Sequence, residues 1–398
     1  MGEGGDGTES KHPVRALLSS GRPSCIPRDP STARRPASAL AALAQDDLQF
    51  CQLAGYAGNV LLTGYTGNLG PEIARQLWAH RIFALVRNPA TAPALRNVTP
   101  VRGTLDELPE QLRPQIEVII HAAACTGFRA PLVELRRVNV EGTRALLDFA
   151  AGCPRLRRFI HLSTTCVAGD REGVIAEAPM QPVPDFVNAY ERSKWEAETL
   201  LLASPLPVEI IRLAIVAGSE MDGSVNRAGA LHHTLHWLYH GLVPMMPAAP
   251  DSRVDLISTE FAAHAVASLL DAPAQHGRIV HATAGASAPR LGELLDHLTG
   301  IFVRTHRAWA RGSIARPDIV DAATFALFED SVRQSGDALF RRVCDDARSF
   351  LPGLLHPRVF ASSLVAAPSA DWRTLADRVF TWLLSHDWGR QPVLRHAA

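Results

Sequence analysis

The sequence predicts an α/β fold in which a doubly wound parallel sheet is followed by a smaller, mainly helical C-terminal part. Two observations support this prediction. Up to about residue 285, short apolar runs alternate with helix-like segments, and beyond it helical patterns dominate. Helical crossovers join parallel strands with a right-handed turn and cover both faces of the sheet, so this alternation is typical of doubly wound folds.

The elements follow in chain order. Apolar runs of strand length predict strands at 59–64, 81–87, 97–103, 117–124, 157–164, 208–216 and 277–285. Longer segments with helical character predict helices at 71–80, 132–151, 189–203, 290–300 and 371–389. Residues 1–48 are rich in Gly, Pro, Ser and Arg without a sustained apolar period, which predicts a disordered tail or linker.

Composition limits the classes of function. The chain has 398 residues, 47% of them hydrophobic, which is enough for one large or two moderate domains. Its 40 basic residues balance 40 acidic ones without a run of like charge, so no nucleic-acid or anionic-membrane surface is expected. No apolar stretch reaches the roughly 18 residues of a membrane span, and no signal peptide follows the start. We therefore expect a cytoplasmic, soluble protein whose partner is a small molecule or another protein.

Cysteine and histidine patterns give no disulfide or metal signal. Six cysteines are scattered without a CxxC pair, which indicates reduced thiols. Cys125 and Cys166 lack a base at a recognisable spacing, so a nucleophilic role is the less favoured interpretation. His232, His236 and His240 share one helical face without Cys or carboxylate companions, so no metal site is expected.

The stretch GNVLLTGYTGNLG, residues 58–70, predicts a phosphate-binding turn between a strand and a helix. In this arrangement Gly64 permits the tight turn, Gly67 lets the backbone approach a pyrophosphate, and Gly70 lets the helix pack on the strand. Amide groups of the first helical turn then face the anion. Glycines also occur in ordinary turns, so the motif is informative in combination with other residues.

Tyr190 and Lys194 lie four residues apart in a predicted helix and therefore project from one face. Lys194 is unusual because the basic residues comprise 38 arginines and two lysines, the other at position 11. A compact ammonium can hold a ribose hydroxyl and lower the pKa of a neighbouring phenol, which a planar guanidinium does poorly. A solvated surface lysine is the alternative. Upstream, the hydroxyls of Ser163, Thr164 and Thr165 end a predicted strand, where they can donate to a carbonyl oxygen or cap the strand.

Together these residues resemble the extended short-chain dehydrogenase/reductases, and within them the thioester reductase and fatty acyl reductase branch with its male-sterility-type NAD-binding domain. The resemblance runs from residue 58 to about residue 300 in the family's order. The matching stretches are LLTGYTGNLG, ALVR, IIHAAA, RRVNVEGTRALLDFA, FIHLSTTCVAG, AYERSKWEAE, IIRLAIVAG and RVDLISTEFAAHAVASLL. The resemblance implies an NADP-binding Rossmann domain at 49–285, with 219–250 contributing to the substrate pocket. A helical substrate-binding part would then follow at 286–398.

The resemblance also implies roles for individual residues. Tyr190 becomes the general acid, Lys194 its partner and the ribose anchor, and Thr164 the hydroxyl that polarises the carbonyl, with Ser163 as the fallback. Asn139 is expected near the active site as a structural or proton-relay residue. The implied cofactor-binding residues are Thr63, Gly64, Thr66, Gly67, Asn68, Leu69, Gly70, Arg87, Ala122, Ala123 and Lys194.

The cofactor is expected to be NADPH rather than NAD. Rossmann sites that prefer NAD place an acid about 20 residues after the glycines, whereas an arginine there accepts the 2′-phosphate of NADP. Arg87 occupies this region and no acid does, although a plain surface arginine is the alternative. Three positions depart from the family pattern: Leu213 replaces a usual proline, Ala168 replaces a frequent tyrosine, and VRGTLDE lacks the usual aspartate of the adenine side.

Three functions compete. The favoured one is reduction of an acyl thioester, bound to a carrier protein or to coenzyme A, to an aldehyde or alcohol. A nucleotide-sugar epimerase or dehydratase would recycle its cofactor, usually NAD, so Arg87 disfavours it. A non-catalytic dinucleotide-binding sensor or scaffold commonly loses the tyrosine or lysine, whereas this chain keeps Tyr190 and Lys194. The oligomeric state does not follow from the sequence.

Overall fold

The computed structural model describes residues 57–348, 351–364 and 371–389. The chain divides into two compact units, Met1–Ala54 and Gly55–Ala398, and the described residues all belong to the second. The tail predicted at 1–48 therefore lies outside the described residues. None of the described helices combines the length and hydrophobicity that a membrane crossing requires.

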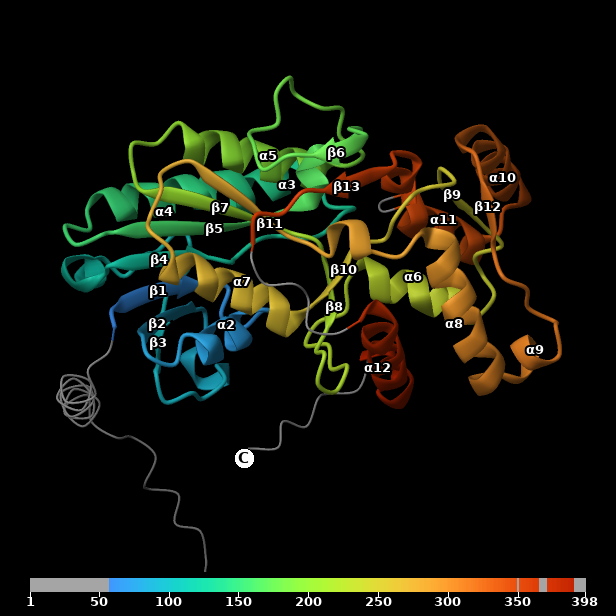
Figure 1. The fold of residues 1–398 in the computed structure, drawn as a ribbon, viewed down its shortest axis with the longest axis horizontal. Coiled ribbons are helices and arrows are strands. Elements are labelled where there is room, and N and C mark those ends of the chain that lie inside the picture. The colour runs from blue at the N-terminus through green and yellow to red at the C-terminus, as the bar shows by residue number, and fades with distance from the viewer. Residues whose placement is uncertain (1–56, 349–350, 365–370, 390–398) are drawn as a thin grey trace, which may run out of the picture. The chain divides into compact units, whose positions relative to one another are not determined.

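A seven-stranded parallel sheet dominates the described unit (Figure 1). Its strands are β1 (Asn59–Thr63), β2 (Arg81–Val86), β3 (Val98–Arg102), β4 (Val118–His121), β5 (Arg158–Thr164), β7 (Val208–Leu213) and β11 (Arg278–Ala282). They lie in the order β11-β7-β5-β4-β1-β2-β3, and every neighbouring pair is parallel, so the predicted doubly wound fold is confirmed. The chain order reverses between β1 and β4, and doubly wound folds bind ligands in the crevice at such a reversal.

Helices cover both faces of this sheet because its strands carry apolar side chains on both sides. One face is covered by α3 (Leu132–Arg136), α4 (Gly142–Ala151) and α5 (Ala189–Leu202), and the other by α2 (Gly70–Gln76) and α7 (Thr259–Asp271) (Figure 1). Successive residues of β1 pack on opposite faces of the sheet. Leu61 belongs to the hydrophobic cluster of Phe149 in α4, whereas Leu62 belongs to that of Ile73 in α2.

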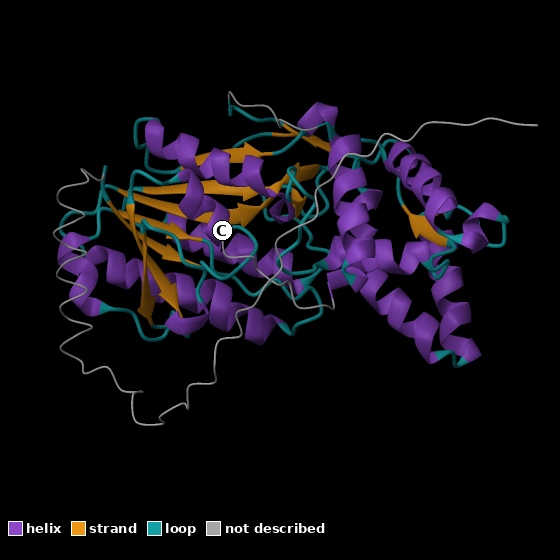
Figure 2. Ribbon diagram, turned by 90° about the horizontal axis from the view of Figure 1, so that it is seen from below, coloured by secondary structure: helices purple, strands orange, loops and turns teal. Residues whose placement is uncertain are grey.

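The C-terminal part is mainly helical, as predicted. Its helices are α8 (Leu291–Thr305), α9 (Arg307–Ala310), α10 (Ala322–Ser335), α11 (Ala338–Arg348) and α12 (Trp372–Ser385), joined by α6 (Ala230–Tyr239) from earlier in the chain. Leu235 of α6, Leu298 of α8 and Phe380 of α12 share a third hydrophobic cluster, separate from the two that flank the sheet. Figure 2 shows these helices gathered to one side of the sheet.

Pairs of short strands connect distant segments. The pairs are β8 (Ile215–Gly218) with β10 (Leu256–Ser258), β9 (Met245–Pro247) with β12 (Asp318–Val320), and β6 (Gly173–Ile175) with β13 (Arg358–Phe360). The apolar run predicted as one strand at 208–216 is divided by this arrangement. It leaves the large sheet after Leu213, and Ile215 pairs with Leu256 instead.

Two predicted helices also differ from the structure. The helix predicted at 71–80 ends at Gln76. The helix predicted at 132–151 contains a π-helical turn at Arg137–Glu141, between α3 and α4. Turns of this kind are rare and often occur at functional sites because the extra residue redirects side chains. Here the turn carries Asn139.

Candidate active site

The turn between β1 and α2 brings two segments of backbone very close together. Gly64 has a φ of +74°, and a Cβ placed there would lie 2.6 Å from the carbonyl carbon of Ala122 at the end of β4. A Cβ at Gly70 would lie 2.4 Å from the Cα of Tyr65. Real side chains do not tolerate either distance, so glycine is required at both positions. The result is a bare backbone surface at the crevice between β1 and β4.

A pocket of about 960 Å³ opens over this turn. Eight of the predicted cofactor-binding residues line it: Thr63, Gly64, Thr66, Gly67, Asn68, Arg87, Ala122 and Ala123. Leu69, Gly70 and Lys194 are not among its lining residues. The pocket is large enough for a cofactor, since small-molecule sites usually occupy about 300 to 1,000 Å³. Its walls also include the loop 124–130 after β4, which sequence reasoning missed, and residues 227–230 at the start of α6, which lie within the stretch 219–250 expected to contribute to the substrate pocket.

A buried hydrogen-bond chain fixes the base of this pocket. Thr143 Oγ1 donates to the carbonyl of Asn139 (2.7 Å), so its oxygen accepts from Nε2 of His121 (3.0 Å). Nδ1 of His121 then accepts from Thr63 Oγ1 (2.8 Å), and Thr63 Oγ1 in turn accepts from the amide of Ala123 (3.1 Å). Burial lowers the pKa of His121 to about 3, so the ring is neutral, as this chain of bonds requires.

Asn139 has a positioning role in the structure. Its Oδ1 accepts from the amide of Cys125 (2.8 Å), and its Nδ2 donates to the carbonyl of Cys125 (3.0 Å) and to Ser193 Oγ (2.9 Å). Ser193 Oγ donates to the carbonyl of Tyr190 (2.8 Å). These bonds connect the pocket loop after β4 to α5, the helix that carries Tyr190.

Tyr190 and Thr164 come together beside the pocket. Each side chain is 8% exposed. Burial raises the pKa of the Tyr190 phenol, while its interaction with the Thr164 hydroxyl lowers it. The ring of Phe128 packs edge-on against Tyr190 at 5.1 Å between centroids, and Phe128 itself lines the large pocket. Tyr190 therefore stands directly behind a pocket wall as a protonated phenol. Ser163, the predicted fallback, has a buried hydroxyl without a partner among the described residues.

Lys194 is held by a partner that the sequence did not suggest. It is 2% exposed, and its Nζ donates to the carbonyl of Leu162 (2.8 Å) and to Nε2 of His161 (2.9 Å). Burial lowers the pKa of Lys194 to about 8, and burial together with Lys194 lowers the pKa of His161. The ammonium thus contacts β5 rather than the phenol of Tyr190, although both residues lie on α5. The remaining ring nitrogen of His161, Nδ1, has no partner among the described residues.

We expect Lys194→Arg to weaken cofactor binding and slow turnover together. A guanidinium is wider than an ammonium, and the site is fully packed. An arginine therefore cannot make the bonds to Leu162 and His161 without displacing the residues around them. The measurements are a fluorescence titration with the cofactor and a steady-state rate. Arg192→Lys, at an exposed position of the same helix, is the matched control. Parent-like affinity and rate in Lys194→Arg would contradict this role.

Other sequence signals have structural explanations. His232 accepts from the amide of Gly229 (2.9 Å) through Nδ1 and bonds the carbonyl of Ala217 (2.8 Å) through Nε2, so it secures the start of α6. The described residues contain no cluster of three or more His, Cys, Asp or Glu suited to a metal ion. Burial raises the pKa of the Cys166 thiol to about 11, which keeps it protonated and weakly nucleophilic.

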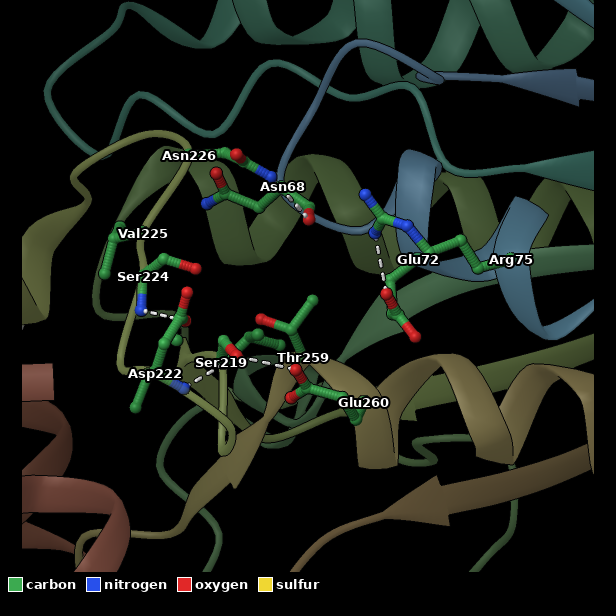
Figure 3. A pocket seen from close by; sticks show the side chains of 13 residues that line it. Asn68, Glu72, Arg75, Ser219, Asp222, Ser224, Val225, Asn226, Thr259 and Glu260 are labelled. Atoms are coloured by element: carbon green, nitrogen blue, oxygen red, sulfur yellow. Dashed lines mark hydrogen bonds and ion pairs between the residues drawn. The ribbon is translucent and has the colours of Figure 1, made fainter. Parts of the chain in front are cut away.

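Asn68 also lines a second, smaller pocket of about 230 Å³ (Figure 3). The acidic side chains that line this smaller pocket already have hydrogen-bond or ion-pair partners. Glu260 accepts from Ser219 Oγ (2.7 Å) and from the amide of Glu220 (2.9 Å), and Glu72 pairs with Arg75 (2.8 Å). The large pocket, which contains the bare glycine turn, is therefore the candidate cofactor site.

Comparisons with known proteins are consistent with a nucleotide-binding site of this kind. Residues 103–266 match the family described as male sterility protein. The 4-hydroxy-2-methyl-3-oxo-4-farnesyl-3,4-dihydroquinoline-1-oxide ketoreductase of Stigmatella aurantiaca is 34% identical over 153 residues, which are 37% of this chain and 46% of that protein. A Drosophila melanogaster protein named as a fatty acyl-CoA reductase is 26% identical over 270 residues, 51% of this chain and 50% of that protein. The chain thus spans half or less of the length of these relatives.

Solved structures share the fold. The crystal structure of the terminal R domain from the myxalamid PKS-NRPS biosynthetic pathway superposes with a TM-score of 0.66. It covers 85% of this chain and 93% of its own, at 24% identity. At that identity the likeness establishes the fold and leaves substrate and product open.

Proposed function

We propose that this chain, which resembles the extended short-chain dehydrogenase/reductases and matches the male sterility protein family over residues 103–266, reduces an acyl thioester with NADPH. The thioester would be carried by a carrier protein or by coenzyme A, and the product would be an aldehyde or alcohol. The observation that carries the proposal is that the buried hydroxyls of Thr164 and Tyr190 lie beside a pocket with a bare glycine turn, Tyr190 packing against Phe128 of its wall.

The residues of this pocket fit a dinucleotide. A Cβ at Gly64 would collide with the backbone of Ala122, so the turn leaves a backbone surface that a pyrophosphate can approach. Thr63, Ala122 and Ala123 would lie along the cofactor, and Arg87 would reach its adenosine end. When bound there, NADPH supplies the hydride that reduces the carbonyl carbon.

Tyr190 and Thr164 would act on the carbonyl oxygen of the substrate. Both hydroxyls donate hydrogen bonds to this oxygen and stabilise the negative charge that develops as the carbon is reduced. Tyr190 then transfers its proton to the oxygen, and expulsion of the thiolate with loss of that proton gives the aldehyde. Phe128 packs edge-on against the Tyr190 ring and helps to fix its position.

The assay that tests the proposal is direct. Purified protein is incubated with NADPH and a panel of acyl-coenzyme A and acyl-pantetheine thioesters, while nicotinamide absorbance and free thiol are followed. We expect one thiol released for each NADPH oxidised where the product is the aldehyde, and one thiol for two NADPH where the aldehyde is reduced further to the alcohol. Absence of both with every thioester would contradict the proposal, and nucleotide-sugar epimerisation without net cofactor consumption would favour the alternative enzyme class.

We predict that NADPH binds more tightly than NADH and that Arg87→Ala brings the two dissociation constants closer together. Arg87 is exposed at the end of β2, lines the pocket and has no ion-pair partner among the described residues, so its charge is available to a 2′-phosphate. A charge-assisted contact of this kind contributes about 1.5 to 3 kcal/mol. Dissociation constants for both cofactors measure the effect. Arg96→Ala, an exposed arginine before β3, is the control, and equal constants in the parent protein would refute the assignment.

A further inference from the structure

The segment Asn226–Arg227 is bound to the glycine turn from the opposite wall of the pocket. Nδ2 of Asn68 donates to the carbonyl of Arg227 (3.0 Å), and Nδ2 of Asn226 donates to the carbonyl of Asn68 (3.4 Å). Figure 3 shows Asn68 and Asn226 facing each other. This pair of bonds joins positions about 158 residues apart in sequence and fixes the backbone of Arg227 beside the turn.

The charge of Arg227 is not used within the described part of the chain. Its side chain lines the same 960 Å³ pocket as Gly64 and Gly67, and no hydrogen bond or ion pair of its guanidinium is found among the described residues. Arg129, in the same pocket, is by contrast paired with Asp346 (3.0 Å). A tethered backbone with an unpaired guanidinium is an arrangement suited to an anionic ligand.

The glycine turn itself supplies no positive charge. The amide of Gly67 donates within the turn to the carbonyl of Gly64 (3.0 Å), and the nearest residues are neutral. Arg87 follows β2, the strand that pairs with β1, and is assigned above to the 2′-phosphate rather than to the pyrophosphate. A pyrophosphate bound at the turn would meet amide groups but no side-chain charge of the turn itself, and the segment bonded to Asn68 provides a cation.

We propose that Arg227 is the counter-ion of the cofactor pyrophosphate and that the bonds between Asn68 and the 226–227 segment hold it in place. This rests on the proposed use of a nicotinamide dinucleotide, but not on the thioester substrate. Arg227 lies just before Gly229, the N-cap of α6, and Leu235 of this helix packs in the C-terminal hydrophobic cluster. Cofactor binding would thus draw together the glycine turn and the segment that leads into the C-terminal helices.

The test is equilibrium binding of NADPH, NADH and coenzyme A, without turnover. Because both dinucleotides contain the pyrophosphate, Arg227→Ala should weaken both by the same factor, on the order of 10- to 100-fold, and leave their ratio unchanged. Arg227→Lys should recover part of the loss. Asn226→Ala keeps the charge but removes one tether, so an intermediate loss is expected. Arg304→Ala, an exposed arginine of α8, controls for net charge.

The possible outcomes distinguish this proposal from the alternative roles of Arg227. If Arg227→Ala weakens NADPH alone, the arginine contacts the 2′-phosphate and the proposal is wrong. If Arg227→Ala weakens the binding of coenzyme A alone, Arg227 contacts a phosphate of coenzyme A, and this result also overturns the proposal. Unchanged binding of all three ligands would do the same. A protein that binds both dinucleotides through Arg227 but reduces no thioester would leave this inference intact and refute the proposed function.

Discussion

Tyr190→Phe is expected to lower turnover by a factor on the order of 10² to 10⁴ while leaving cofactor affinity nearly unchanged. The substitution keeps the ring that packs against Phe128 and removes the hydroxyl that interacts with Thr164. Because burial raises the pKa of this phenol, it is protonated throughout the neutral range and available as an acid. Phenylalanine keeps the ring and its packing against Phe128, so dinucleotide binding should be little disturbed.

Steady-state thioester reduction and a cofactor titration measure the two effects separately. Thr164→Val is the companion variant, since it removes the second donor while Tyr190 remains, and a smaller loss of rate is expected. Ser163→Ala tests the fallback hydroxyl on the same strand, whose oxygen has no partner among the described residues, and a larger loss of rate than in Thr164→Val would move the carbonyl contact to Ser163. Near-parent turnover in Tyr190→Phe would show that the carbonyl oxygen receives its proton from another group, and the catalytic assignment would have to be abandoned.

The sequence predicts the sheet well because strand formation leaves a local signal. Every strand of the large sheet falls on a predicted apolar run, and the glycines at 64 and 70 stand where backbone approach requires them. The division of the run 208–216 was not predictable in the same way. No turn residue separates Leu213 from Ile215, and the change of partner depends on Leu256, some forty residues later.

The side-chain environment of the site was less predictable than its motifs. His161 and Lys194 are 33 residues apart and Asn68 and Arg227 are 159 apart, so neither contact leaves a local pattern. His121 and Thr143 are visible in the sequence, but their bond depends on the geometry of the π-helical turn between α3 and α4. Sequence reasoning therefore named the candidate site residues and missed most of the residues that hold them in place.

A buried ion pair anchors the helix that carries Tyr190 and Lys194. Glu198, one turn after Lys194 in α5, accepts from Nε (3.0 Å) and Nη2 (2.7 Å) of Arg212 on β7. Arg212 is 0% exposed and Glu198 is 2% exposed. Nη1 of Arg212 also donates to the carbonyl of Ala178 (3.0 Å), so the guanidinium is fixed within the packed interior. Such a pair contributes little net stability compared with apolar residues, but each charge depends on the other.

Glu198→Ala should therefore lower the free energy of unfolding by about 3 to 5 kcal/mol, because it leaves the Arg212 guanidinium buried without a counter-charge. This is a large share of the roughly 5 to 15 kcal/mol that stabilises a folded domain. Glu196→Ala is the matched control: it lies on the same helix and pairs with Arg136 and Arg192, whose side chains are 43% and 54% exposed. Exposed pairs contribute little, so its loss should be small. Urea unfolding followed by circular dichroism compares the two. Equal losses would mean that Arg212 finds compensation elsewhere and that the pair does not anchor α5.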